Sequence, residues 1–381
     1  MVVGQMGHQI PTKVMHPPLI GCNAEKAIKY AVGDEFVFKA KSDGVVKKID
    51  EKNELIIIEY KDGTQAPIDL STKNGRVSDG YFISIRLQHE LKVGDKFKAN
   101  DILAMDKQYF KGLGNEASLM VGMLTNVAVA STDITYEDSS IISQRLMRGM
   151  ESDVTFDKKI ALSPTSNITN VKVKGDKIKA GESLLIYEEV FGAEDDSVSK
   201  LLTKIGDKFQ ENINEYAKST VPSKYSGEIV EMKIYYNREI EEYSESIQEL
   251  IRRYQRKNKE KVALLEKTDR TQVVHIPTVE KVNTDRVAGQ EFDGLMIHYF
   301  IKTTNVFVPG NKLAVGVALK SIVGSIYDEG KNPVSESGEE VDLCLSPFST
   351  ASRMVPDAFK QGYVNKCLIK MKSNVLDIFA D

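Results

Sequence analysis

The sequence of 381 residues predicts an α+β fold that is rich in β-strands. Short β-branched or alternating segments, separated by Gly-Asp turns, occupy much of residues 30–110 and 295–325, and such segments are typical of strands. One long stretch, residues 240–267, repeats its apolar side chains at helical spacing. We therefore expect barrel-like sheets together with one amphipathic helix.

The strand prediction depends on particular runs and turns. Val45 and Val46 follow the turn dipeptide Asp43-Gly44, and residues 56–60 form a β-branched and aromatic run. Residues 295–301 are nearly all apolar or aromatic, and the lysine-bearing stretch 311–320 follows after Pro309-Gly310. Each run is short and bounded by turn residues, as expected for strands that close a barrel.

One phrase occurs twice. Residues 94–103, G-D-K-F-K-A-N-D-I-L, are similar to residues 175–184, G-D-K-I-K-A-G-E-S-L. Each copy places a Gly-Asp turn before an alternating pattern and a second turn, which predicts two similar barrel corners. The copies lie too far apart for a solenoid. A coincidental turn-rich phrase is the alternative, and such a corner carries no chemistry by itself.

The stretch 240–267 predicts an amphipathic helix. Tyr243, Ile247, Leu250 and Tyr254 recur at helical spacing and form its apolar face. Acidic residues dominate its first half and basic residues its second half, an order that complements the helix dipole. The basic residues are Arg252, Arg253, Arg256, Lys257, Lys259 and Lys261. A solvated face explains this charge pattern, and a basic end offered to nucleic acid or a partner is the alternative.

Composition excludes several classes of protein. No run of 18 apolar residues exists and the N-terminus lacks a signal pattern, so we expect neither membrane insertion nor secretion. The 3 cysteines are far apart, which fits a reducing compartment and argues against a zinc or disulfide framework. The net charge of −4 excludes a protein that binds nucleic acid by bulk charge alone.

Common catalytic motifs are missing from the sequence. There is no phosphate-binding P-loop, no H-E-x-x-H and no G-x-S-x-G, and the 5 histidines have no metal-ligand spacing. Glu291 and Asp293 flank Phe292, but a catalytic magnesium site needs three converging carboxylates. We therefore predict a plain turn before the strand at residue 295 and no metal site there.

Three groups of residues could carry chemistry. Glu137 and Asp138 precede an apolar-periodic segment, where they could cap a helix or lie near a metal–nucleotide complex. Lys312 and Lys320 flank a glycine-containing segment, and lysine is a compact charge suited to phosphate. Arg353 could make bidentate phosphate contacts. Two isolated lysines on a loop are usually solvated surface residues, which is the alternative interpretation of Lys312 and Lys320.

Taken in chain order, these pieces resemble the C-terminal half of the β subunit of multisubunit DNA-directed RNA polymerases. The similar motifs span residues 9–354, almost the whole chain. They are Q-I-P-T (9–12), P-L-I-G (18–21) and E-K-A-I (25–28), then G-N (114–115) with Y-E-D-S-S-I-I-S-Q-R-L (136–146), P-G-N-K-L-A (309–314), V-D-L-C-L-S-P (341–347) and S-R-M (352–354).

The sequence also departs from the family. After Ala314 the family reads G-R-H-G-N-K-G, of which only the second lysine is kept here, as Lys320. After Met354 the family's N-[IV]-G-Q is replaced by V-P-D-A. The family's N-terminal half and its final clamp-contacting segment have no counterpart in the sequence. This divergence resembles giant-bacteriophage RNA polymerases, whose large subunits are split among several proteins.

The resemblance implies a nucleotidyltransferase subunit that is inactive alone. Mg²⁺ would be held mainly by a β′-like partner, with Glu137 and Asp138 near a second magnesium ion or the incoming triphosphate. Lys312 and Lys320 would contact the RNA 3′ end, and Arg353 the phosphates of the nucleotide. Further implied partners are an N-terminal β-like subunit, DNA template, RNA, NTPs and a promoter-specificity factor, in the bacterial host cytoplasm or the virion.

The resemblance also divides the chain. Residues 1–154 would form a hybrid-binding and barrel region, and residues 155–300 a flap-like domain that carries the amphipathic helix. Residues 301–381 would return to an active-centre double-psi β-barrel. Two other classes of function stay open: a non-catalytic β-barrel transcription factor or nucleic-acid-binding module, and a carrier domain. The carrier is disfavoured because a modified-lysine M-K-M tripeptide is missing.

Overall fold

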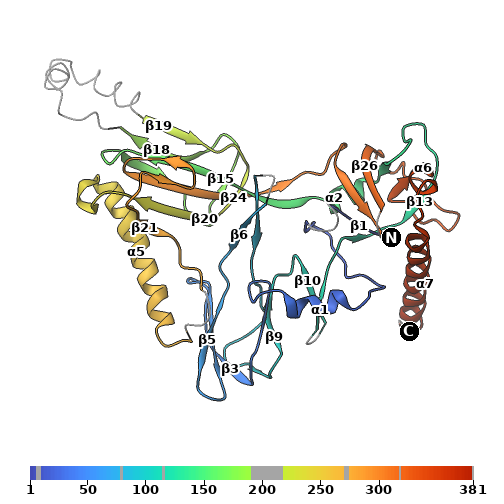
Figure 1. Ribbon diagram of the computed structural model, residues 1–381, viewed down its shortest axis with the longest axis horizontal. Coiled ribbons are helices and arrows are strands. Elements are labelled where there is room, and N and C mark those ends of the chain that lie inside the picture. The colour runs from blue at the N-terminus through green and yellow to red at the C-terminus, as the bar shows by residue number, and fades with distance from the viewer. Residues whose placement is uncertain are drawn as a thin grey trace. The chain divides into compact units, whose positions relative to one another are not determined.

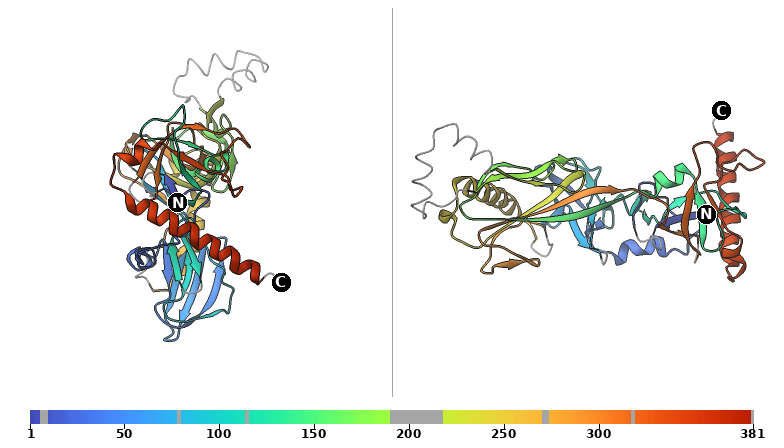
Figure 2. Two further views of the ribbon diagram at one scale, coloured as in Figure 1. Left: turned by 90° about the vertical axis from the view of Figure 1, so that its right-hand side faces the viewer. Right: turned by 90° about the horizontal axis from the view of Figure 1, so that it is seen from above.

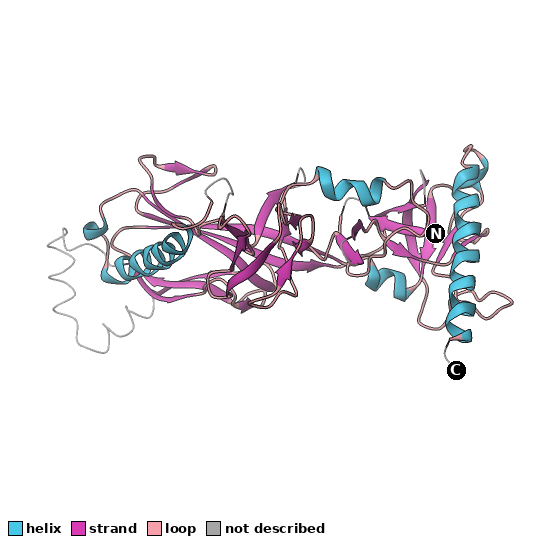
Figure 3. Cartoon of the chain, turned by 90° about the horizontal axis from the view of Figure 1, so that it is seen from below, coloured by secondary structure: helices cyan, strands magenta, loops and turns pink. Residues whose placement is uncertain are grey.

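The computed structural model confirms a β-rich α+β protein, with many short strands spread along the chain and a few helices (Figure 3). It describes residues 1–5, 10–77, 80–113, 116–189, 218–269, 274–316 and 319–379. The chain forms two compact units. Unit 1 comprises residues 1–44, 85–153 and 304–381, and unit 2 comprises residues 45–84 and 154–303.

These units differ from the three segments expected from the sequence. The first and last segments, 1–154 and 301–381, contribute to the same unit. Residues 45–84 leave the first segment and join the middle one. Strands at residues 73–76 and 82–85 form one end of the large sheet of unit 2, and this long-range pairing has no local signal in the sequence.

Unit 1 is built on a mixed seven-stranded sheet. Two of its neighbouring pairs, β14–β26 and β13–β27, are parallel, and the pairs β1–β25, β25–β26 and β14–β27 are antiparallel. In spatial order the strands are β12 (Met123–Leu124), β1 (Val2–Gln5), β25 (Lys312–Val315), β26 (Leu319–Ile326), β14 (Ser139–Ile142), β27 (Leu343–Leu345) and β13 (Val127–Val129).

Other elements complete unit 1. They are α1 (Ala24–Ala31), the pair β2 (Val37–Lys39) and β9 (Ile102–Met105), β8 (Lys96–Phe97), the hairpin β10 (Phe110–Leu113) and β11 (Glu116–Leu119), α2 (Gln144–Gly149), α6 (Phe348–Ala351) and α7 (Pro356–Ile378). Side chains from β1, β14, β25, β26, β27 and α2 meet in one apolar core. Figure 2 shows α7 as the long C-terminal helix of this unit.

Unit 2 contains a second seven-stranded sheet. Its strands in spatial order are β17 (Lys177–Ile178), β20 (Gly227–Tyr236), β24 (Leu295–Asn305), β15 (Ser152–Leu162), β7 (Phe82–Ile85) and β6 (Lys73–Arg76), with β21 (Val279–Lys281) paired to β20. Smaller sheets are formed by β16 (Asn167–Val171), β18 (Ser183–Glu188) and β19 (Lys218–Pro222), and by β22 (Arg286–Val287) and β23 (Gln290–Glu291). Three further strands, β3 (Gly44–Asp50), β4 (Leu55–Tyr60) and β5 (Gln65–Asp69), are neighbours in a four-stranded sheet.

The amphipathic helix predicted for residues 240–267 is confirmed. A short 3₁₀ turn, η2 (Ile240–Glu242), leads into α5 (Glu245–Leu265), which lies beside the sheet of unit 2 (Figure 1). Ile247, Leu250 and Tyr254 are buried in the core of this unit together with Tyr243, which precedes the helix. The interpretation of Lys261 as a solvated residue is wrong, because its side chain is buried.

The two Gly-Asp corners predicted from the repeated phrase are similar in structure. In each, the aspartate carboxylate accepts a hydrogen bond from the backbone amide three residues earlier, at 2.7 Å for Asp95 and 2.8 Å for Asp176. The preceding glycines, Gly94 and Gly175, have φ angles of 92° and 95°, which favour glycine. The corners are therefore local turn structures, each stabilised within its own unit.

Some expected features lie outside the described residues. These are Gln9, Gly114-Asn115 and Val317-Ala318 of the polymerase-like motifs. In the part of the chain that the structure covers, no helix has the length and apolar character needed to cross a membrane.

Candidate functional site

The hairpin of β25 and β26 places Lys312 and Lys320 on one face. The strands are antiparallel, with Lys312 opposite Ile322 and Lys320 opposite Ala314. Paired residues and residues two apart on a strand share a face, so the lysines are diagonal neighbours. Both lysines are exposed. The alternate residues of the two strands point into the apolar core of unit 1 and fix the register.

A tight turn sets where this hairpin begins. Gly310 has a φ of 94°, in the left-handed region that glycine adopts without strain, and its amide donates to Val323 O at 2.7 Å. Asn311 replaces the aspartate of the family's P-G-D-K motif, and its Oδ1 accepts from the Val308 amide at 2.8 Å. The turn is therefore held although the charge is lost, and Lys312 follows it directly.

The Glu137-Asp138 segment is anchored to the same sheet. Asp138 has a φ of 53°, an unusual conformation for a residue other than glycine. Its carbonyl oxygen accepts from the Ile322 amide of β26 at 2.7 Å, and its own amide donates to Ser349 Oγ of α6 at 2.9 Å. These contacts join the start of β14 to β26 and α6 at one place, and they fix the backbone of Asp138.

The structure brings Asp138 together with Arg353. The guanidinium makes a bidentate pair with the carboxylate, with Nη2 at 2.8 Å from Oδ2 and Nη1 donating to Oδ1. The hydrogen bond from Arg353 holds the pKa of Asp138 below its usual range, and the same contact raises the pKa of Arg353. The side chains are 44% and 37% exposed. A ligand can therefore reach the pair.

The other predicted residues lie around this pair without joining it. Glu137 is exposed, and its negative charge also raises the pKa of Arg353. Within the described ranges, Lys312 and Lys320 form no ion pair with Glu137 or Asp138. The expected helix-capping role belongs instead to Ser143, whose Oγ accepts from the Leu146 amide at the start of α2.

The carboxylates here do not suit direct binding of Mg²⁺. Both oxygens of Asp138 are engaged by Arg353, and Glu137 alone offers too few of the oxygen ligands that Mg²⁺ requires. Among the residues that the structure describes, no three His, Cys, Asp or Glu side chains converge as metal ligands. Asp293 is held by Arg238 in a bidentate pair, at 2.9 and 2.6 Å, in the turn before β24.

Sequence reasoning missed a pair of exposed aromatic rings beside this site. Tyr136 and Phe348 contact each other with ring centroids 5.1 Å apart. It also missed the role of Asp342, which is buried and accepts from Ser143 Oγ at 3.1 Å and Arg145 Nε at 2.9 Å. The partners lie far apart in the sequence, and their spacing gave no signal.

Unit 1 also has an open cavity of about 600 Å³. Its lining includes Lys13, Lys107 and Lys111 together with Met105 and Phe110. Lys107 pairs with Glu90 at 2.7 Å, and Lys13 pairs with Glu151. None of the predicted site residues lines this cavity, and Lys312 and Lys320 are exposed on the surface of the sheet.

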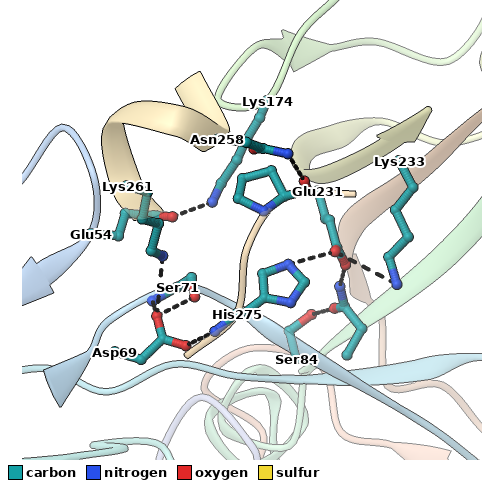
Figure 4. Close-up of polar contacts among 12 residues, drawn as sticks. Glu54, Asp69, Ser71, Ser84, Lys174, Glu231, Lys233, Asn258, Lys261 and His275 are labelled. Carbon is teal, nitrogen blue, oxygen red and sulfur yellow. Dashed lines mark hydrogen bonds and ion pairs between the residues drawn. The ribbon is translucent and has the colours of Figure 1, made fainter. Parts of the chain in front are cut away.

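Unit 2 has a different polar cluster, drawn in Figure 4. Asp69 accepts from Lys261 Nζ at 3.4 Å and from the His275 amide at 2.7 Å. The His275 ring contacts Glu231, with Nε2 2.9 Å from Oε1, and Asn74 donates to the other Glu231 oxygen at 2.7 Å. These contacts join several segments inside the unit, which indicates a structural cluster.

Comparison with known proteins identifies a family. A family model described as RNA polymerase Rpb2, domain 6, matches residues 106–368. This range includes Glu137, Asp138, Lys312, Lys320 and Arg353. No curated protein matches the sequence.

Proposed function

Because this chain belongs to the RNA polymerase Rpb2 domain 6 family, we propose that it forms the part of a β-type subunit that faces the site of RNA synthesis. The observation that carries this proposal is the exposed surface made by β25, β26 and the Asp138–Arg353 pair. Its residues come from three segments of unit 1, all within the matched range. Multisubunit polymerases work as complexes, so the chain acts together with other subunits.

The two lysines suit a role in holding phosphate. Phosphoryl transfer depends mainly on positioning and on neutralising the charge of the phosphates. Lys312 and Lys320 present two positive charges on one face of a rigid hairpin, and the core residues beneath them hold that hairpin in register. We assign them to phosphates at the RNA 3′ end or of the incoming nucleotide.

The Asp138–Arg353 pair suits a role in positioning. An exposed ion pair contributes little to stability, so a triphosphate can replace the carboxylate as the partner of the guanidinium. Until then, Asp138 keeps the arginine fork extended beside β26. Mg²⁺ for the reaction would be held mainly by the β′-like partner, because the carboxylates here are not arranged to bind it.

The proposal also assigns roles to the remaining parts of both units. The strands around Lys312 and Lys320 would belong to the β-side double-psi barrel. Unit 2, with α5, would include the flap over the exiting RNA. The bacteriophage origin and the additional N-terminal β-like subunit also stay predictions. A non-catalytic β-barrel transcription factor is the competing function, and the experiment below separates the two.

The test is single-nucleotide addition on a preassembled RNA–DNA scaffold, with the chain assembled with its β′-type partner. Lys312→Ala or Lys320→Ala should lower the rate about 30-fold to 1000-fold, since each change removes a preorganised charge from the transition state. Lys47→Ala is the matched control, because Lys47 is a half-exposed lysine paired with Glu59 in unit 2. Rates within twofold of wild type for both active-site variants would contradict the assignment. An assembled wild-type complex without polymerase activity would favour the competing function.

A further inference from the structure

Tyr136 and Phe348 form an aromatic pair that is exposed on the surface of unit 1. Their ring centroids are 5.1 Å apart and their planes are inclined by 31°. The side chains are 72% and 52% exposed. Two large rings that contact each other while both remain this exposed form a contiguous apolar surface, and such surfaces mark sites where proteins bind ligands or partners.

Two partly buried hydrogen bonds hold the segments that carry this pair. Ser346 Oγ donates to the carbonyl oxygen of Tyr136, and the Asp138 amide donates to Ser349 Oγ at 2.9 Å. Both serines are 1% exposed. The segment that carries Tyr136 is therefore attached to the segment that carries Phe348 on both sides of the ring contact. The rings are preorganised, so a ligand that stacks on them has little conformational entropy to overcome.

The same segments carry the charged groups of the proposed site. Asp138 lies two residues after Tyr136, and Arg353 lies five residues after Phe348. The next strand pairing, Ser139 with Ile322, places the exposed row of β26 beside this turn. Ile322 itself is 42% exposed, and Lys320 lies on the same face of β26. An apolar platform next to cationic groups matches a nucleotide, which combines a flat base with phosphates.

We propose that Tyr136 and Phe348 are positioning residues on which a nucleobase stacks while Arg353 and the β26 lysine meet the phosphates. This inference rests on the proposed function. Aromatic side chains stack with any base, because every base has a π-face, so the platform would hold a nucleotide without selecting its sequence. The base belongs either to the incoming NTP or to the nucleotide at the RNA 3′ end.

Single-nucleotide addition by the assembled polymerase tests the platform. Tyr136→Ala and Phe348→Ala should raise the KM for the NTP, or weaken binding of the RNA 3′ end, by about 5-fold to 100-fold. The kcat at saturating substrate should change much less. Tyr136→Phe and Phe348→Tyr keep the rings and should stay within twofold of wild type. Tyr363→Ala is the matched control, since Tyr363 of α7 is 73% exposed in the same unit.

Fluorescence distinguishes the two sources of the base. Stacking quenches 2-aminopurine, so the probe is placed either at the RNA 3′ end or in the incoming triphosphate. Quenching that Tyr136→Ala relieves only at the RNA 3′ end assigns the platform to the transcript. Relief only with the probe in the triphosphate assigns it to the incoming nucleotide. Either result supports the proposal.

Two outcomes would overturn the inference. Alanine variants with wild-type KM and unchanged quenching would show that no base stacks on the rings. The second outcome is an assembly defect: the alanine variants bind the partner subunit poorly, but the fraction that does assemble binds nucleotide normally. That result would show that the rings contact a protein and not a base. In both cases a large effect of Lys312→Ala would leave the proposed function standing. An inactive wild-type complex would remove both.

Discussion

Each unit of this protein has an aspartate paired with a basic side chain, and the two pairs differ in their exposure to water. In unit 1, Asp138 and Arg353 have side chains that are 44% and 37% exposed. In unit 2, Asp69 and Lys261 have side chains that are 5% and 4% exposed. Residue types alone do not separate the two pairs. Burial and the number of satisfied partners do.

The buried pair is part of the architecture of unit 2. Removing two charges from water is costly, and the cost is offset only when hydrogen bonds satisfy the remaining donors and acceptors. Asp69 meets this requirement through Lys261, Ser71 and the His275 amide, which join β5, α5 and the segment before β21 (Figure 4). Burial lowers the pKa of Lys261, and the nearby Asp69 opposes that shift.

The exposed pair is suited to exchange. Water screens the attraction between Asp138 and Arg353, so a phosphate can compete for the guanidinium without leaving a charge buried. A charged pair that is available for ligand binding is therefore one whose loss lowers the free energy of unfolding only a little.

The largest effect is expected from breaking the buried pair. Asp69→Ala leaves the Lys261 ammonium buried without its carboxylate and should lower the free energy of unfolding by about 3 to 5 kcal/mol. Lys261→Met should cost less, because Asp69 keeps its hydrogen bonds from Ser71 and His275. Urea unfolding of the full chain measures both changes through the midpoint and slope of the transition.

Arg353→Ala is the matched control for this experiment. It breaks a bidentate pair of the same charge type at an exposed position, so the urea midpoint should stay at the wild-type value. If Arg353→Ala destabilises the chain as much as Asp69→Ala does, the distinction between a structural and an exchangeable pair is wrong.

Local features of this protein were predictable from its sequence. The α5 helix follows from the spacing of Ile247, Leu250 and Tyr254, and the corners at Gly94 and Gly175 follow from turn chemistry. These patterns act over a few residues, so the sequence displays them directly. Local features also offered Lys312, Lys320, Asp138 and Arg353 as candidates, and the family resemblance gave each of them an expected role.

Long-range pairing was not predictable. Lys261 contacts Asp69 across 192 positions of sequence, and Arg353 contacts Asp138 across 215. Within α5, Lys261 looks like the other basic residues, and only the position of β5 makes it a buried residue. The inclusion of residues 45–84 in unit 2 was missed for the same reason. Contacts of this kind depend on topology, which one sequence does not reveal.

An intermediate effect is expected from the exposed basic row of α5. Arg252, Arg256 and Lys259 line a shallow groove on this helix, and none forms an ion pair with another described residue. Replacing all three by glutamine removes positive charge without touching the buried face. Initiation at a promoter should fall about 3-fold to 10-fold and lose part of its salt dependence. Extension of a preassembled scaffold should be unchanged, because the proposed flap assignment puts this row away from the site of nucleotide addition.

The matched control lies on the same groove. Glu245 and Glu249 line its other end, and glutamine in both places alters the charge without removing a cation. This double variant should initiate at least as well as wild type. A triple variant that fails even on a preassembled scaffold would place α5 near the reaction and contradict the flap assignment.

The smallest effect is expected from pH. Burial alone raises the pKa of Glu231, but the hydrogen bond from His275, the charge of Lys233 and the hydrogen bond from Asn74 outweigh it, so the pKa is held below 4.5. A carboxylate with a lowered pKa in the folded state stabilises the protein above the unfolded pKa, and this contribution is lost as the pH falls through the folded value. The wild-type urea midpoint should therefore decrease as the pH falls from about 5 to about 3, and Glu231→Gln should flatten that decrease.

Asp138→Asn is the exposed comparison. Its pKa is also lowered by its arginine, but solvent screens that pair, so the slope should change less. Equal slopes for wild type and Glu231→Gln would mean that the buried carboxylate does not contribute to acid sensitivity.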